Sequence, residues 1–213
     1  SVLAIEFQKS KVGNPLVNAG AIATTSLLTG QDKAGKWNRI LNFYSGCAGS
    51  ELAIMQDVYE SEAATNDRNQ AIARLLAAYG RMYDDPAEAV DLYTMQCSVG
   101  INSTQLAAMG ATLAAGGVNP FSGERMFSNE HVPQLLSVML SCGMYDYSGT
   151  WSFKTGLPAK SGVGGGIVAV VPGKGAVAAF SPRLDEAGNS IRAQKAIAYI
   201  SEQLEINIFA PQS

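Results

Sequence analysis

The stretch that decides the fold is Leu157-Pro158-Ala159-Lys160-Ser161-Gly162-Val163-Gly164-Gly165-Gly166-Ile167-Val168-Ala169-Val170-Val171. Its second half is a continuous apolar run rich in β-branched residues, which predicts a buried strand. Its first half is polar and contains several glycines, which predict a bend. Lys160 and Ser161 come just before these glycines. Such a segment is either a glycine-rich hairpin edge with an exposed lysine or a strand edge that forms one wall of a site.

The composition is typical of an ordered globular protein. The chain has 213 residues, of which 47% are hydrophobic and 15% charged, enough for one large core or two modest ones. The formal net charge is −3 and the lysines and arginines are scattered, so we expect no nucleic-acid partner. No apolar run has the length that a bilayer span needs, and the N-terminus has no signal-like core, so we expect no membrane association.

Cysteine and histidine usage argues against a disulfide framework and against a metal site. Cys47, Cys97 and Cys142 are odd in number, far apart and without a Cys-x-x-Cys pair, which predicts reduced, mostly buried thiols in a cytoplasmic protein. His131 is the only histidine, so any histidine-based catalytic system would depend on this one side chain. A structural role is more common for a lone histidine beside a helix start. We expect no metal and no cofactor.

The chain begins at Ser1, without an initiator methionine and inside an apparent strand at residues 2–7. We therefore expect that an N-terminal portion of the native protein is absent from this sequence. A polar turn at residues 9–13 follows, and then a helix over residues 19–28, for which either Asn14 before Pro15 or Asn18 supplies the start.

Hydrophobic periodicity predicts that the middle of the chain is almost wholly helical. Asp85-Pro86-Ala87-Glu88 is a capping box with proline at the first helical position. The expected helices cover residues 36–44, 51–59, 62 or 66 to 79, 85–97, 103–115 and 133–142.

Strands return near residues 151–153, 166–171 and 176–180, before a helix over 190–204 that Ser190 caps. The order of a strand, a helical block, consecutive strands and a helix predicts an α+β fold, an antiparallel sheet with helices segregated against it. We expect one domain over 1–213, with a helical subdomain at about 14–143 and a sheet subdomain at about 1–8 and 150–213.

Two polar features of this plan are candidates for chemistry. Glu62 and Asn69 are seven residues apart and would share one face of a helix, where a carboxylate and an amide could hold an α-ammonium and an α-carboxylate. A solvated polar face explains the same spacing equally well. Tyr145 lies in a glycine-flanked loop before the sheet, where a phenol near a lysine could relay a proton or could simply pack.

Several blocks of the chain together resemble the glutaminase family, most closely bacterial glutaminases, and the resemblance covers essentially the whole chain. The order and spacing of the blocks agree with the family throughout. The blocks are Asn14-Pro15-Leu16-Val17-Asn18-Ala19-Gly20-Ala21-Ile22, Ser61-Glu62 with Asn69, Gly143-Met144-Tyr145, the stretch 157–167 with its Lys-Ser-Gly, and Phe180-Ser181-Pro182 with Leu184-Asp185 and Gly188-Asn189-Ser190.

The resemblance implies a β-lactamase-like fold and a serine-dependent amidohydrolase that converts L-glutamine and water to L-glutamate and ammonia. It implies that Glu62 takes the α-ammonium of the substrate, and that Asn18 and Asn69 donate to its α-carboxylate. Tyr93 would help to fix the backbone end of the substrate. Tyr145 would stand near the nucleophile, and the N–H of Val163 would supply half of an oxyanion hole.

The sequence departs from the family in one respect. The family attacks with the serine of a Ser-x-x-Lys motif, whose lysine is the activating base, and these 213 residues contain no Ser-x-x-Lys. We expect the motif in the absent N-terminal part, and we expect the 213-residue chain by itself to be inactive.

Two other functions stay open. A penicillin-binding-like peptidase, esterase or β-lactamase would keep the fold and would be acylated by penicillins, but it leaves Glu62 and Asn69 without a role. A nonenzymatic amino-acid-binding protein would have lost the nucleophile in nature. Family members are commonly oligomeric, so the resemblance also implies a homo-oligomer, a dimer or a tetramer.

Overall fold

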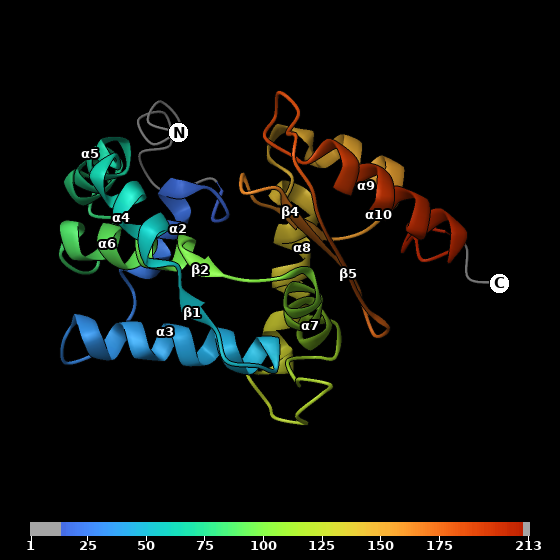
Figure 1. The fold of residues 1–213 in the computed structure, drawn as a ribbon, viewed down its shortest axis with the longest axis horizontal. Helices are drawn as coiled ribbons and strands as arrows, with labels where there is room; N and C mark the ends of the chain where they lie inside the picture. The colour runs from blue at the N-terminus through green and yellow to red at the C-terminus, as the bar shows by residue number, and fades with distance from the viewer. Residues whose placement is uncertain (1–13, 211–213) are drawn as a thin grey trace. The chain divides into compact units, whose positions relative to one another are not determined.

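The computed structural model describes residues 14–210, so the strand predicted at residues 2–7 lies outside the described residues. The chain divides into two compact units (Figure 1). Unit 1 consists of residues 1–43 and 52–100, and unit 2 of residues 44–51 and 101–213. Each unit has its own buried apolar cluster.

Unit 1 is built from helices and one short strand pair. Its core is the cluster of Ala19, Ile22, Ile72, Ala73, Leu76 and Val90, each buried. The short strands run antiparallel with Ala53 opposite Gly100. Its elements are α2 (Asn18–Thr25), most of α3 (Lys33–Ala48), β1 (Ala53–Ile54), α4 (Gln56–Ala64), α5 (Asp67–Ala78), α6 (Pro86–Cys97) and β2 (Val99–Gly100).

The start of α6 confirms the predicted cap at Asp85, whose carboxylate accepts a hydrogen bond from the Glu88 N–H at 2.8 Å. The reciprocal half of the capping box does not form, because the Glu88 carboxylate binds the Lys36 ammonium instead. The start of α2 differs from both predictions. Its N-cap is Val17, with no side-chain cap, while Asn14 accepts from the Leu16 N–H and Asn18 is already helical.

The helix predicted from residue 62 or 66 to residue 79 is two helices. The chain leaves the helical path at Thr65, with φ −127°, and Asp67 starts α5 after Asn66. The helix predicted over residues 51–59 is likewise wrong at its beginning, where β1 pairs with β2 before α4 starts at Gln56.

The helix predicted over residues 36–44 runs on to Ala48, through the small residues Ser45, Gly46 and Cys47. Packing explains the extension, since Cys47 and Ala48 are buried. The carbonyl of Cys47 also accepts hydrogen bonds from the hydroxyl of Thr112 and the amide of Asn119. Contacts with distant residues therefore outweigh the poor helix propensity of this segment.

Unit 2 is an α+β arrangement around an antiparallel sheet in the order β3-β4-β5, which confirms the predicted fold class. Ser161 lies opposite Ile167, and Gly166 lies opposite Phe180. The elements are α7 (Ser103–Ala114), η1 (Asn129–His131), α8 (Val132–Cys142), η2 (Tyr145–Tyr147), α9 (Ser148–Thr155), β3 (Ala159–Ser161), β4 (Gly166–Val171), β5 (Gly175–Phe180) and α10 (Ile191–Gln203).

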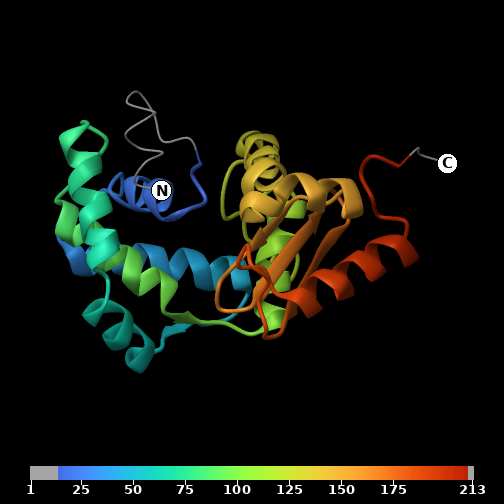
Figure 2. The ribbon, with the colours of Figure 1, turned by 90° about the horizontal axis from the view of Figure 1, so that it is seen from above.

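Strand β4 packs on both faces, as its continuous apolar run predicts. One face, with Ile167 and Ala169, belongs to the core cluster that includes Ile197 of α10. The other face carries Val168, which lies against Gly110 of α7. Helices α7 and α10 therefore cover opposite faces of the sheet (Figure 2).

Helix α9 replaces the strand predicted near residues 151–153. Ser148, Trp151 and Thr155 are buried at helical spacing, while Phe153 is 89% exposed. The Trp151 indole N–H donates to the Leu157 carbonyl at 2.9 Å, which ties the helix to the chain entering β3. The preference of tryptophan and phenylalanine for strands is therefore outweighed here by the burial that stabilises the helix.

The two units do not coincide with the expected subdomains. Helices α7 and α8 precede residue 143, yet both pack against strands of the sheet and belong to unit 2. The reason is that the second face of the sheet has to be covered by an apolar helix. No helix within residues 14–210 is long and apolar enough to cross a membrane.

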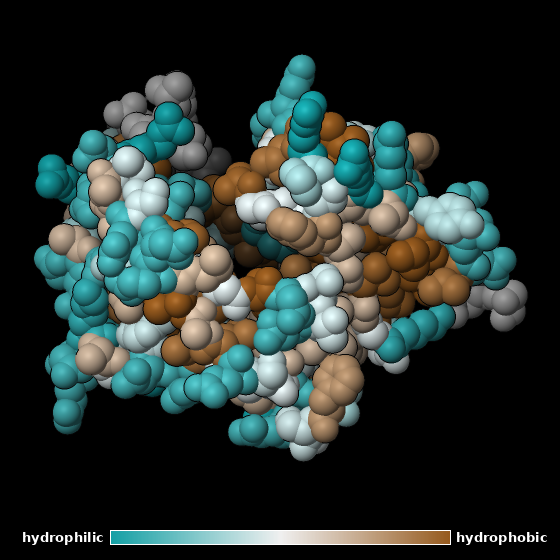
Figure 3. All heavy atoms as spheres, in the orientation of Figure 1, coloured by the Kyte–Doolittle hydropathy of each residue, from teal (hydrophilic) through white to brown (hydrophobic). Residues whose placement is uncertain are grey.

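The visible surface carries hydrophilic side chains over both units (Figure 3). Hydrophobic atoms gather on unit 2 beside β5 and α10. The strand β5 ends in Phe180, which is 67% exposed. Within the described residues, β5 pairs only with β4, so its other edge carries no strand there.

Candidate functional site

Two of the amides that the sequence singles out lie together in unit 1. Asn18 is the first residue of α2, and its side-chain amide donates to the Asn69 amide oxygen at 2.8 Å. Asn69 lies in the first turn of α5. The two helices pack through buried Ile22 and Ile72, so the apolar core sets the positions of both amides.

Glu62 and Asn69 do not share a helix face, which corrects the predicted relation between them. Glu62 lies in the last turn of α4, whereas Asn69 lies beyond the break at Thr65. Within the described residues Glu62 forms no ion pair, and its side chain is exposed. Tyr93 lies on α6, partly buried against the core cluster that holds α2 and α5.

Tyr145 is held in an unusual backbone conformation in unit 2. Its φ is +55°, a left-handed value that is rare for a residue with a side chain. The Ser148 hydroxyl donates to the Tyr145 carbonyl at 2.7 Å and accepts from the Met144 N–H at 3.0 Å. The phenol of Tyr145 donates to the Ser161 carbonyl at 3.1 Å. Strained residues that are held this firmly cluster at functional sites.

Lys160 and Ser161 lie beside this phenol on β3. The Lys160 ammonium lies 4.7 Å from the centre of the Tyr145 ring, within the range of a cation–π interaction, and also donates to the Ser161 carbonyl. The Ser161 hydroxyl oxygen is buried and has no hydrogen-bond partner among the described residues. A bound substrate or a water molecule could form the missing hydrogen bond with this hydroxyl.

Val163 lies in the glycine-rich loop between β3 and β4. The loop is closed by hydrogen bonds of 2.9 Å from the Gly162 N–H to the Gly166 carbonyl and from the Gly165 N–H to the Gly162 carbonyl. Val163 is 71% exposed. Within the described part of the chain its N–H donates to no backbone or side-chain acceptor, so this N–H can receive a ligand oxygen.

Glycines bring this loop and Tyr145 close together. A Cβ added at Gly188 would lie 3.7 Å from both Tyr145 Cε2 and Val163 Cγ1, so Gly188 separates the two side chains. A Cβ added at Gly143 would lie 1.8 Å from the Ala159 carbonyl oxygen, which shows how closely the Tyr145 loop approaches β3. Only glycine permits such an approach at residue 143.

Three residues that position Tyr145 had no role in the expectations from sequence, although two of them, Gly188 and Asn189, lie in a family block. They are Ser148, Gly188 and Asn189, whose side-chain amide donates to the Met144 carbonyl at 3.2 Å. A turn was visible at residues 185–188, but its contact with Tyr145 spans some 40 residues of sequence and leaves no local pattern. The structure therefore groups Asn18 with Asn69 in unit 1, and Tyr145 with Val163 in unit 2.

The three cysteines and the histidine differ in exposure. Burial raises the pKa of the Cys47 thiol to about 11, so this thiol stays protonated. Cys97 is exposed and Cys142 is half-buried, so the expectation of mostly buried thiols is wrong. His131 is exposed beside Glu130. Within residues 14–210, no cluster of three or more His, Cys, Asp or Glu side chains could hold a metal ion.

The sheet with helices on both faces and the lysine-bearing strand at its edge define an α+β protein of the β-lactamase-like class. The family model for glutaminase matches residues 1–209. The glutaminase of Colwellia psychrerythraea is 53% identical over 209 residues, which cover 98% of this chain and 67% of that protein. The chain belongs to the glutaminase family and spans about two thirds of the length of the curated relatives it matches.

Solved structures agree with this assignment. The probable glutaminase ybaS has a TM-score of 0.97 and 50% identity, over 99% of this chain and 68% of that chain. A structure of Mglu, described as its glutamate form, has a TM-score of 0.93 and 40% identity, over 100% of this chain and 49% of that chain.

Proposed function

We propose that these 213 residues form the substrate-binding and oxyanion-stabilising part of a glutaminase that hydrolyses L-glutamine to L-glutamate and ammonia. The observation that carries the proposal is the 53% identity to a curated glutaminase over 98% of the chain. The bound state described for Mglu, its glutamate form, fits an amino-acid product.

In this proposal Glu62, Tyr93 and two amides hold the α-amino-acid end of glutamine. The exposed Glu62 carboxylate binds the α-ammonium, and Tyr93 helps to fix this end. The hydrogen bond between Asn18 and Asn69 supports their shared role, because it orients the two amides relative to each other. The remaining N–H groups of both amides are then available to donate to the α-carboxylate.

Tyr145 and Val163 act on the amide end of the substrate. A serine oxygen attacks the side-chain amide carbon, and the Val163 N–H donates to the oxygen that becomes negative. The lysine of the Ser-x-x-Lys motif takes the proton of the attacking serine, and the Tyr145 phenol passes a proton to the departing nitrogen, which leaves as ammonia. The phenolate then regains a proton from that lysine. Water then hydrolyses the acyl-serine ester to release L-glutamate. The Lys160 ammonium, close to the Tyr145 ring, favours negative charge on the phenol oxygen during this transfer.

The attacking serine and its lysine base belong to a Ser-x-x-Lys motif, which these 213 residues do not contain. We propose that the motif is encoded upstream of Ser1. Sequencing the gene upstream of the Ser1 codon, and assaying its full product for ammonia release from L-glutamine, tests this directly. A product that carries Ser-x-x-Lys and hydrolyses glutamine supports the enzyme. A product without the motif that binds glutamine but releases no ammonia supports a nonenzymatic amino-acid-binding protein.

The assembly and the compartment are part of the same proposal. We propose a homo-oligomer, a dimer or a tetramer, in the cytoplasm. Light scattering coupled to size-exclusion chromatography measures the mass in solution, and a mass equal to one chain contradicts the oligomer. Fractionation of the source cells tests the compartment.

A further inference from the structure

A tight turn at residues 184–190 precedes helix α10 and is closed by its own backbone. Leu184 and Ser190 form an antiparallel bridge, and the Asp185 N–H donates to the Asn189 carbonyl at 2.8 Å. Ser190 is also the N-cap of α10. The turn is therefore closed at its base and continuous with the helix.

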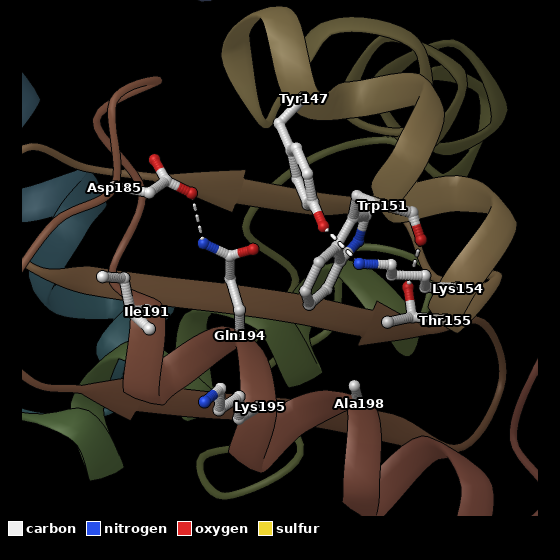
Figure 4. Close-up of a pocket in the computed structure, with 9 residues that line it drawn as sticks. All are labelled: Tyr147, Trp151, Lys154, Thr155, Asp185, Ile191, Gln194, Lys195 and Ala198. Atoms are coloured by element: carbon white, nitrogen blue, oxygen red, sulfur yellow. Dashed lines mark hydrogen bonds between the residues drawn. The ribbon is translucent and has the colours of Figure 1, made fainter.

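The Asp185 carboxylate organises the inside of this turn. One of its oxygens accepts from the Ala187 and Asn189 N–H groups at 3.0 and 2.9 Å. The other accepts from the Gln194 side-chain amide at 2.7 Å, which ties the turn to α10 (Figure 4). The Gly188 N–H donates to the Asp185 carbonyl at 3.0 Å. Within the described residues Asp185 forms no ion pair, so these donors account for its position.

The charge of Asp185 makes these hydrogen bonds strong. Burial by itself would raise the pKa of Asp185, but the hydrogen bonds lower it below the ordinary value. The carboxylate is therefore charged at neutral pH, and a charged acceptor forms stronger hydrogen bonds than a neutral one.

The same turn contacts both groups that are assigned to the amide end of the substrate. Gly188 has a φ of +95°, and a Cβ added there would lie 3.7 Å from Tyr145 Cε2 and from Val163 Cγ1. The fully buried Asn189 donates from its side-chain amide to the carbonyl of Met144, the residue before Tyr145, at 3.2 Å. A turn that loses its shape would disturb both contacts together.

We propose that Asp185 is a positioning residue for glutamine hydrolysis, which holds the turn that fixes the Tyr145 phenol and the Val163 N–H relative to each other. This role rests on the proposed function, in which both groups act on the transition state while Glu62 holds the other end of the substrate. A displacement of about 1 Å at such groups can cost about 100-fold in rate. Loss of Asp185 should therefore affect turnover and leave substrate binding nearly unchanged.

Kinetics of the glutamine-hydrolysing protein test this role. Asp185→Ala should lower kcat about tenfold or more and change KM less than about twofold. Asp185→Asn should keep kcat within about threefold of the unchanged protein, because its amide oxygen still accepts from the same two N–H groups. Glu186→Gln, at the exposed carboxylate next to Asp185, should change neither constant. A loss confined to KM, or an asparagine variant as impaired as the alanine variant, would overturn the proposal.

A double-mutant cycle separates positioning from a general structural role. In the Tyr145→Phe background, Asp185→Ala should lower kcat by a smaller factor than in the unchanged protein, because part of its effect passes through the phenol. An equal factor in both backgrounds would contradict the proposed role.

The 213-residue chain allows a further test that needs no glutamine hydrolysis. In ¹H–¹⁵N correlation spectra, Asp185→Ala should shift the amide resonances of Tyr145 and Val163, and Glu186→Gln should shift neither. Unshifted resonances in an Asp185→Ala chain with unchanged far-ultraviolet circular dichroism would overturn the positioning role. If the full gene product releases no ammonia, the proposed function fails, and the spectra still decide whether Asp185 holds the two groups in place.

Discussion

Tyr145 has a strained backbone conformation that contacts with neighbouring residues maintain. Its left-handed φ of +55° costs about 1–3 kcal/mol for a residue with a side chain. The Ser148 hydroxyl on its carbonyl and the Ser161 carbonyl on its phenol hold it there. The strain therefore places the phenol at β3 with little freedom to turn away.

Replacing Tyr145 with phenylalanine should remove proton transfer and keep the ring. In the glutamine-hydrolysing protein, Tyr145→Phe should lower kcat about 100-fold or more and change KM for glutamine little, because general acid–base catalysis contributes roughly 10²–10⁴-fold. Steady-state ammonia release measures both constants. Tyr199→Phe, an exposed tyrosine of α10, is the control. A Tyr145→Phe enzyme with unchanged kcat would exclude the phenol from proton transfer.

Glu62 is the residue whose charge should matter for binding. Glu62→Gln keeps the shape but removes the partner of the substrate ammonium, and hydrogen bonds to charged groups contribute about 1.5–3 kcal/mol. We expect kcat/KM for glutamine to fall about 10–100-fold, mainly through KM. Glu60→Gln, another exposed carboxylate of α4, should leave the kinetics unchanged. Equal kcat/KM values for Glu62→Gln and Glu60→Gln would contradict the proposed role of Glu62 in binding the substrate ammonium.

Two helical glycines differ in the space that an added side chain would have. A Cβ at Gly110 of α7 would lie 2.6 Å from Ala176 Cβ and 2.7 Å from Val168 Cγ2, whereas a Cβ at Gly149 of α9 would have no neighbour within 4 Å. Gly110→Ala should therefore cost about 1–3 kcal/mol through overpacking. Gly149→Ala should be neutral or slightly stabilising, because alanine favours helix.

Thermal unfolding followed by circular dichroism compares the two alanine variants. A cost of 1 kcal/mol lowers Tm by about 2–4 °C in a chain of this size. Equal Tm values for Gly110→Ala and Gly149→Ala would mean that α7 can move away from β4 and β5 without loss.

An ion-pair cluster joins α3 to the start of α6 and should make stability depend on pH. Hydrogen bonds from the Lys36 ammonium and then the Asp85 N–H lower the pKa of Asp84 below its ordinary 3.8. Hydrogen bonds to Asp84 and Glu88 raise the pKa of Lys36 above 10.5. The contribution of Asp84 to the free energy of unfolding is therefore present above pH 3.8 and is lost as the pH falls through the lowered pKa. The contribution of Lys36 is lost only as the pH rises through its raised pKa.

Urea unfolding across pH tests this cluster. The free energy of unfolding of the unchanged chain should decrease as the pH falls from about 5 toward 3. Asp84→Asn should be less stable at pH 7, and its free energy of unfolding should decrease less steeply over this acid range, which we call the acid limb. Asp57→Asn, at an exposed carboxylate in the first turn of α4, should keep the full acid limb. An acid limb in Asp84→Asn as steep as in the unchanged chain would contradict the assignment.

For the chain as a whole, the absence of a Ser-x-x-Lys motif leads to a clear prediction. The purified 213-residue chain should release no ammonia from glutamine above the uncatalysed rate, because the proposed oxyanion hole and binding residues have no nucleophile to assist. Denaturation measurements on the same sample establish that it is folded. Glutamine hydrolysis by this material, at a rate that Tyr145→Phe lowers, would show that a nucleophile lies within the 213 residues.

Much of the fold was predictable because it depends on neighbouring residues. Asp85 and Ser190 cap their helices through hydrogen bonds that span three residues, so the sequence alone marks the starts of α6 and α10. The uncharged apolar run of β4 likewise predicts a strand that is buried on both faces. The family blocks predicted site residues by number, but they carry no geometry.

Tertiary contacts decided the rest. Neither the break between Glu62 and Asn69 nor the helix around Trp151 could be seen locally, since each depends on which side chains find a buried position.

The sequence by itself determined the α+β class, the N-caps of α6 and α10, the buried strand and the family. Only the tertiary structure decided that Asn18 binds Asn69 and that Gly188 lies between Tyr145 and Val163, because those residues are separated along the chain by more than the reach of any helical or strand period.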